Sequence, residues 1–283
     1  MKISRRLTTL GLAVALVAGL AGCGGGSSSD VLKTAQKKLA DVKSVTYEMD
    51  MDMGLSVADQ SFTSKTLATI DYIQDPLAMK IQMSMDMGAQ GSADITMYAE
   101  KVDDKYVMYM SPDGTSWMKN TSDDASEFGM YDAQDTMGVY LDGFTNLTEA
   151  GTEAINGSDA VRYDGVISKD SLEDVLTASG VLDQFAQYGL TEEELDTLYE
   201  GLDDLAASIW IDKESELPVK YTMDMTTLMQ QLFAKVQEGS NTKNLPADMK
   251  VDSLVVSLTL SNFNGVKAID IPAEARNGVE TDF

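Results

Sequence analysis

The sequence predicts an α+β fold in which an antiparallel sheet packs against helices. Long segments alternate apolar and polar residues, which is the pattern of strands that bury one face. Other segments repeat apolar residues every three or four positions, as amphipathic helices do. The two patterns occur in a clear order, with one helix first, then strands, a helical interruption, and strands again. Such an order of elements is expected for one domain that combines a sheet with helices.

The first residues predict export and a lipid anchor rather than a part of the fold. Three basic residues precede an apolar run over residues 7–17, and small residues then lead to Cys23, the single cysteine of the chain. This arrangement is typical of a signal peptide. Residues 20–23, Leu-Ala-Gly-Cys, resemble the bacterial lipobox. The resemblance implies that residues 1–22 are removed and that Cys23 receives a diacylglyceryl group.

Two alternatives to the lipid anchor are a transmembrane anchor and an ordinary secreted protein with a spare thiol. A spanning helix needs about 20 apolar residues, and the apolar run is shorter. Two acyl chains suffice for stable attachment at about 0.8 kcal/mol per buried methylene, so we expect the protein at the outer face of the bacterial cell membrane. Residues 23–29 have the composition of a flexible tether. We expect one domain over residues 30–271 and a loose tail over residues 272–283.

Composition excludes several classes of function. The chain has no histidine, which removes Ser-His-Asp and Cys-His sites and the common zinc sites. Its formal net charge of −25 lacks the basic footprint of a nucleic-acid-binding protein. Acidic clusters such as Asp50 with Asp52 have no EF-hand spacing, so we interpret them as solvated faces and expect no metal and no cofactor. A hydrolase with two catalytic carboxylates is a third alternative, although no particular pair stands out.

The first half of the chain predicts one helix followed by a meander of strands. Apolar residues at helical spacing predict an opening helix over residues 30–43. From Val45 to Met53 every odd position is apolar and every even position is polar. The same alternation returns over residues 79–87, after a strand around residues 64–74. Further short strands are predicted over residues 95–100, 106–110 and 116–119.

The second half mixes helices with strands. Residues 121–148 break the alternation and predict a partly helical excursion. A hairpin follows over residues 151–155 and 160–167, with its turn at Asn156-Gly157. A capping box at residues 191–194 precedes one of the later helices. Helices are predicted over residues 172–182, 195–205 and 228–236, and strands over residues 207–211, 217–225 and 254–263.

Methionine is the most informative residue type in the predicted strands. The chain contains 18 methionines, although branched residues suit strands better. Unbranched thioether side chains give an adaptable apolar surface that repacks around different partners, so this face could close over an acyl chain. An ordinary core is the alternative, because methionine also fills irregular gaps. The candidate ligand-binding residues are Met49, Met51, Met53, Met83, Met85, Met87, Met108, Met110, Met223 and Met225.

Three segments resemble a known family. They are Ser111 to Trp117, Ala154 to Tyr163, and Ile209 to Tyr221, with the sequence IWIDKESELPVKY. Together with the lipobox, they are similar to the carrier superfamily of LolA and the mycobacterial lipoproteins LppX and LprG, and most of all to an uncharacterised group of Gram-positive lipoproteins. The resemblance implies a curved half-barrel with helices packed on its concave face, around an apolar cavity that takes acyl chains in characterised relatives. It implies no catalytic residue.

We therefore expect a non-enzymatic lipoprotein, monomeric and tethered through Cys23. Its ligand is expected to be a lipid or a lipidated molecule, bound between the methionine face and the helices. The alternative is a structural or interaction module of the cell envelope with a solid core and no ligand cavity. The methionine content and the helix near residues 228–236 depart from the family pattern, which leaves the size of the cavity and the ligand open.

Overall fold

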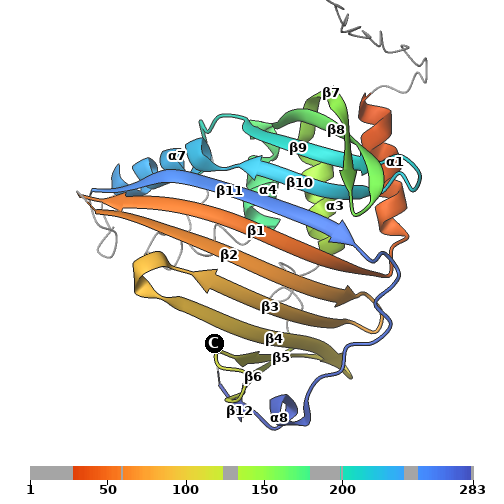
Figure 1. Cartoon of the computed structure of the whole chain (residues 1–283), viewed down its shortest axis with the longest axis vertical. Coiled ribbons are helices and arrows are strands. Elements are labelled where there is room, and N and C mark those ends of the chain that lie inside the picture. Colours follow the sequence, from red (N-terminus) through yellow and green to blue (C-terminus); the bar gives the residue numbers. More distant parts are fainter. Residues whose placement is uncertain are drawn as a thin grey trace, which may run out of the picture.

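The computed structural model describes residues 28–58, 60–123, 133–178, 198, 200–238 and 248–281. These residues form one large curved sheet with most of the helices on one side (Figure 1). Within them, twelve strands follow the order β12-β6-β5-β4-β3-β2-β1-β11-β10-β9-β8-β7. Neighbouring strands are antiparallel except β12, which runs parallel to β6. The predicted α+β fold with a curved antiparallel sheet is confirmed.

The sheet consists of two meanders joined in its middle. Strands β2 to β6 each pair with the strand before them in the chain, and β1 also pairs with β11, which is followed across the sheet by β10, β9, β8 and β7. The pairing of β1 with β11, which are far apart in the sequence, therefore joins the two meanders. The strands are β1 Ser44–Val57, β2 Gln60–Ile73, β3 Ala78–Asp86, β4 Ser92–Val102, β5 Lys105–Ser111, β6 Met118–Ser122, β7 Phe144–Ile155, β8 Ser158–Ile167, β9 Leu205–Asp212, β10 Pro218–Asp224, β11 Met249–Ser261 and β12 Val279–Glu280.

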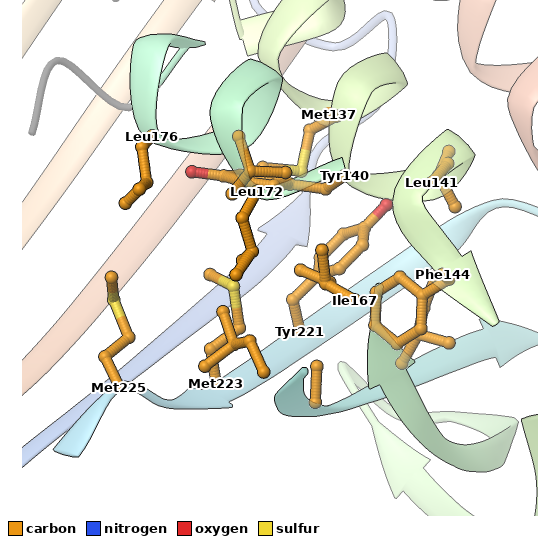
Figure 2. Packing of buried hydrophobic residues seen from close by; sticks show 14 of the residues in the cluster. Met137, Tyr140, Leu141, Phe144, Ile167, Leu172, Leu176, Tyr221, Met223 and Met225 are labelled. Atoms are coloured by element: carbon orange, nitrogen blue, oxygen red, sulfur yellow. The ribbon is translucent and has the colours of Figure 1, made fainter. Parts of the chain in front are cut away.

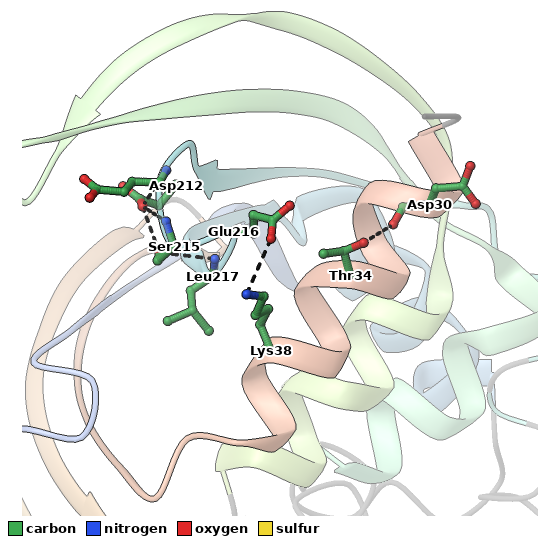
Figure 3. Close-up of polar contacts among 8 residues, drawn as sticks. Asp30, Thr34, Lys38, Asp212, Ser215, Glu216 and Leu217 are labelled. Atoms are coloured by element: carbon green, nitrogen blue, oxygen red, sulfur yellow. Dashed lines mark hydrogen bonds and ion pairs between the residues drawn. The ribbon is translucent and has the colours of Figure 1, made fainter. Parts of the chain in front are cut away.

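The longer helices gather over one half of the sheet. Figure 1 places α1, α3, α4 and α7 over the part that contains β7 to β11, and in Figure 3 the strands arch around the helices. None of the helices within the described ranges is both long and apolar enough to cross a membrane. The helices are α1 Ser28–Ala40, α3 Ala133–Gly143, α4 Leu172–Ala178, α7 Thr226–Glu238 and α8 Ala273–Arg276, with short 3-10 turns at Gly88–Gln90 (η1) and Lys169–Ser171 (η2).

Helix α1 is held by its apolar face. Leu32, Ala35 and Leu39 are buried on that face, and burying one leucine stabilises a fold by about 1.5–3 kcal/mol. Lys38 forms an ion pair with Glu216 at 3.5 Å (Figure 3), with both side chains about half exposed. Exposed ion pairs contribute little, so burial rather than charge positions this helix.

The turn between β9 and β10 is built on Asp212. Its Oδ1 accepts hydrogen bonds from the backbone N–H of Glu214 at 3.1 Å, the backbone N–H of Ser215 at 2.7 Å and the Ser215 hydroxyl at 2.8 Å (Figure 3). Burial by itself raises the pKa of Asp212, but these hydrogen bonds outweigh it, so the pKa lies below its usual value. Residues Ile209 to Tyr221, with the sequence IWIDKESELPVKY, therefore form a strand, a capped turn and a second strand.

The main core lies between the longer helices and the sheet. Leu172 of α4 lies above Met223 of β10, and Leu176 lies above Met225 (Figure 2). Burial raises the pKa of the Tyr140 phenol to about 12, and it raises the pKa of Tyr221 well above its usual value. Both phenols therefore stay neutral at physiological pH. Other residues with almost no exposed surface here are Ile167, Ile209, Leu232, Val236 and Leu260.

The C-terminal segment packs on the opposite, convex face, where the sequence analysis predicted a loose tail. Ala275 of α8 is fully buried in a cluster with Tyr98 and Tyr109. Arg276 Nη2 lies 2.9 Å from Glu100 Oε2, and the Tyr109 hydroxyl donates to Glu100 Oε1 at 2.9 Å. Up to residue 281, the prediction of a loose tail is wrong, because apolar contacts, this ion pair and β12 fix the segment. Helix α8 also shows that the helices are not confined to the concave face.

The predicted helix over residues 195–205 is wrong at its end. Leu205 begins β9, where it lies opposite Ile167 in the ladder with β8. A turn with Gly201 at a φ of +72° precedes the strand, and a glycine there adopts a conformation that helices do not use. Residues 179–197, which include the capping box and the end of the helix predicted over residues 172–182, lie outside the described residues.

The predicted excursion over residues 121–148 contains the last two residues of β6, one helix and the start of another strand. Helix α3 covers Ala133–Gly143, but β7 begins at Phe144 because this segment pairs with β8. Residues 124–132 lie outside the described residues. Strand and helix positions elsewhere agree with the sequence patterns, and the observed strands are mostly longer than predicted.

Candidate ligand-binding surface

Methionine side chains form continuous cross-strand rows on the concave face of the sheet, beside the half covered by helices. Directly opposed residues of antiparallel strands lie on the same face. Met83 of β3 lies opposite Ala68 and Ile95, and Met97 of β4 lies opposite Ile81. Because these registers connect, the thioethers form one surface across several strands. We call it the methionine surface and define it as Met49, Met83, Met85, Met97, Met108, Met110 and Met118.

A second row continues the methionine surface to β6, next to the edge strand β12. Met110 of β5 lies between Met97 on one side and Met118 of β6 on the other. Met108 lies opposite Ala99 of β4. All seven side chains of the methionine surface are half-buried. They are therefore neither fully packed core residues nor freely exposed ones.

A small buried cluster supports one side of the methionine surface. Met79, Ile81 and Ala99 are almost fully buried, and Met97 and Met108 pack against them. Near the start of β5, Lys101 Nζ lies 5.6 Å from the centre of the Tyr106 ring, a geometry in which a cation is attracted to the ring face. The middle of the surface thus carries aliphatic and thioether groups, and Lys101 lies at its rim.

Five of the ten predicted methionines lie on the methionine surface, and two others border it. Met49, Met83, Met85, Met108 and Met110 are members. Their neighbours Met51 and Met53 in β1 are partly buried and pack against the main core. The structure thus brings most of the predicted side chains to one face.

The remaining three predicted methionines lie elsewhere. Met223 and Met225 are 5% and 8% exposed and belong to the main core beneath the helices. Met87 follows the end of β3 at the start of the η1 turn, and its side chain is 37% exposed. A ligand-binding role for any of the ten stays a prediction, and geometry favours it most on the part of the sheet away from α1, α3, α4 and α7.

Met97 and Met118 were not among the predicted ligand-binding residues. Met97 lies between Ile95 and Ala99 in a segment that alternates apolar and polar residues, so this alternation predicts its inward position. Met118 is different, because β6 is short and only its register with Met110 places it on this face.

Acidic side chains of the described residues do not assemble into a metal site. Among the described residues, no group of three acidic, histidine or cysteine side chains could hold a metal ion. The Asp50 and Asp52 carboxylates lie on the convex face, where both contact Lys65 Nζ, at 2.6 and 3.3 Å. This pair is an ion-paired surface cluster, which agrees with its interpretation as a solvated face.

Four hollows among those bounded by described residues have volumes of about 250 to 630 Å³. None of these four lies between the methionine surface and the helices. One of about 360 Å³ lies where α1 meets β7, beside Leu32 and Phe144. The largest opens on the convex face. The enclosed apolar cavity expected from the sequence stays a prediction.

Comparison with known proteins places the chain in a family. A protein family of unknown function, DUF6612, matches residues 27–280. The chain belongs to the DUF6612 family. No curated protein matches this DUF6612 chain. The match covers every described helix and strand.

Solved structures with a similar arrangement have low identity to this DUF6612 protein. Lipoprotein LppX of Mycobacterium tuberculosis is 17% identical, with 86% of this chain and 100% of LppX covered and a TM-score of 0.46. LprF of Mycobacterium bovis is 14% identical, with 87% and 96% covered and a TM-score of 0.47. A putative outer membrane lipoprotein-sorting domain of Vibrio parahaemolyticus is 11% identical, with 87% and 96% covered and a TM-score of 0.24.

Two mycobacterial lipoproteins and a lipoprotein-sorting domain are thus among the similar structures. Their TM-scores lie below 0.5, so they carry no conclusion about what the DUF6612 chain binds. Function must be argued from its own side chains.

Proposed function

We propose that the protein is a non-catalytic, membrane-tethered lipoprotein that takes up the apolar chain of a lipid or a lipidated molecule on its methionine surface. The observation that carries the proposal is the continuous set of half-buried thioethers across β3 to β6. Soluble proteins rarely expose a large contiguous apolar patch without a binding role. A concave apolar surface with few polar groups is the usual form of a lipid site.

Apolar burial alone supplies enough affinity for such a ligand. Covering about 200 Å² of apolar surface contributes about 5 kcal/mol at 25 cal/mol per Å². Part of this is lost in ordering the ligand and the side chains. Thioether chains adjust at low energetic cost to ligands of different shape, so the site is expected to select for apolar character rather than for one head group.

The rival function is a structural or interaction lipoprotein with a solid core. The packing of Met223 and Met225 beneath α4 favours this rival for the half of the sheet under the helices (Figure 2). The same argument does not extend to Met97 and Met110, which are half-buried. The two functions therefore differ in what they predict for the methionine surface.

A binding measurement with a fluorescent palmitate analogue separates the two functions. The triple variant Met83→Gln, Met97→Gln, Met110→Gln keeps side-chain length but adds amides, so we expect it to weaken binding by about 10-fold or more. Leu67→Gln is the matched control, because Leu67 is 46% exposed on the opposite face of β2. The same affinity in wild type, triple variant and control, or no binding to any of them, refutes a methionine-surface carrier.

The membrane tether is a separate part of the proposal. It rests on Cys23, which lies outside the described residues. Cells expressing the Cys23→Ser variant should release the protein from the membrane fraction and should not label it with radioactive palmitate. Membrane retention and labelling of this variant would show that the anchor lies elsewhere.

A further inference from the structure

A groove lined by both polar and apolar groups crosses the convex face of the sheet, behind the methionine surface. Its volume is about 630 Å³, the largest of the four hollows described above. One wall is a continuous row of side chains, because each residue lies opposite the next in the ladders from β4 to β10. This first wall consists of Thr96, Gln82, Thr69, Glu48, Thr259 and Lys220.

The second wall runs parallel to the first, two residues further along each strand. It follows the same ladders from β4 to β11. The floor between the walls is the backbone of Ile95, Met83, Ala68 and Met49, whose side chains point to the concave face. Strands lie about 4.8 Å apart, so a groove across six strands is about 24 Å long. The second wall consists of Asp94, Ser84, Leu67, Asp50 and Ser257.

The lining narrows the class of ligand that this groove suits. The walls carry hydroxyl, amide and carboxylate groups, so an acyl chain would leave them without hydrogen bonds. The floor backbone is already paired within the sheet, so a peptide cannot add to it as a strand. Polyanions would meet Glu48, Asp94 and the net charge of −25.

Charges of both signs lie along the groove. Asp50 pairs with Lys65 at 2.6 Å, and Lys220 stands at the β10 end of the first wall, whereas Asp94 stands at the β4 end of the second wall. A strongly cationic ligand would meet Lys220 at one end and would compete with Lys65 for Asp50. Leu67 adds an apolar group in the middle of the polar walls, with 46% of its surface exposed. Rows of donors and acceptors around one apolar platform suit a sugar ring, which presents hydroxyl groups at its edge and C–H groups on its face.

We propose that this convex groove binds a linear glycan of neutral sugars, lying across the strands from β4 to β10. Gln82 and Glu48 hydrogen-bond its hydroxyl groups, and Leu67 packs against the face of one ring. The site is separate from the methionine surface, because its side chains leave the opposite face of the sheet.

Calorimetric titration with two oligosaccharides tests the groove. The probes are a hexamer of β-1,4-linked N-acetylglucosamine and a hexamer of β-1,4-linked glucose, which distinguish acetamido sugars from plain hexoses. Binding of either one to the wild-type chain is the expected result. Each of Gln82→Ala and Leu67→Ser should weaken it about 5-fold, since one net hydrogen bond or apolar contact contributes about 1 kcal/mol.

Lys80→Ala is the matched control, because Lys80 lies on the same face of β3 outside the groove lining. Met97→Gln is the control for the other face. Both should bind the oligosaccharide as wild type does, and circular dichroism should show all four variants folded. The proposal is overturned if neither hexamer binds, if Gln82→Ala and Leu67→Ser bind unchanged, or if Lys80→Ala weakens binding as much as they do. Loss of palmitate binding alone would count against the proposed carrier function and not against the groove.

Discussion

Oxidation of the methionines offers a direct test of where an apolar ligand lies. Peroxide converts the thioether to a polar sulfoxide, and exposed sulfur atoms react first. Met97 and Met110 are half-buried, whereas Met79 and Met223 are 2% and 5% exposed. We therefore expect the methionine surface to oxidise well before the core methionines, because their burial keeps peroxide away from them.

The magnitude of the effect on binding follows from the cost of covering a sulfoxide. Burying a polar group without a hydrogen bond costs about 1–3 kcal/mol in proteins. One sulfoxide beneath an acyl chain should then lower the affinity for palmitate by about 5-fold to 100-fold. Unfolding is not expected at this stage, because the core methionines are still intact.

Peptide mass mapping during a peroxide time course, with and without palmitate, provides the assay. Bound palmitate should slow the oxidation of Met97 and Met110. Met87 is the internal control, since it is 37% exposed but lies beyond the end of β3, and palmitate should not protect it. Equal protection of Met87 and Met97, no protection of either, or an unchanged affinity after oxidation of Met97 would refute the reasoning.

Three further predictions concern stability, each measured by urea unfolding. A Cβ at Gly165 would lie 2.7 Å from the Thr145 carbonyl oxygen, so Gly165→Ala should destabilise the fold by about 1–3 kcal/mol. Gly138 lies in open space on α3, so Gly138→Ala should instead stabilise the fold by about 0.5–1 kcal/mol. Equal effects of the two substitutions would contradict the close packing around Gly165. Leu232→Ala removes a fully buried side chain and should cost about 2–5 kcal/mol, so a change within 0.5 kcal/mol, the usual range for surface sites, would mean that α7 does not pack as described. The pKa of Asp212 is below its usual value, so its contribution is present at neutral pH and is lost as the pH falls through its folded pKa; Asp212→Asn should flatten the acid side of the stability curve, and an unchanged curve would contradict the capped turn.

Local patterns predicted the strands of the first half well, because their alternation is a property of the chain alone. Val45 to Met53 faces the core on one side and water on the other, so every second residue had to be apolar. Leu205 was assigned to a helix because its spacing from Leu198 and Leu202 is helical, but pairing with β8 decided its structure. A distant strand can override local spacing, and nothing near Leu205 in the sequence shows that partner.

The presence of inward-facing methionines was predictable from the sequence, but the extent of the methionine surface was not. Inward positions of Met83 and Met108 follow from alternation, whereas the separation of Met223 from the methionine surface depends on which half of the sheet the helices cover. That choice is set by long-range packing of α4 and α7. The order of the C-terminal segment depends in the same way on Ala275 meeting Tyr98 and Tyr109, residues far away in the sequence.

The floor of the convex groove is the backbone of residues whose side chains build or border the methionine surface, including Met49 and Met83. A single layer of backbone therefore separates the convex groove from the methionine surface. If a ligand on the methionine surface bends or flattens strands β1 to β4, the spacing between the two walls of the convex groove must change as well. Curvature of this one layer is a shared mechanical variable, and it couples the two faces without any relay of side chains.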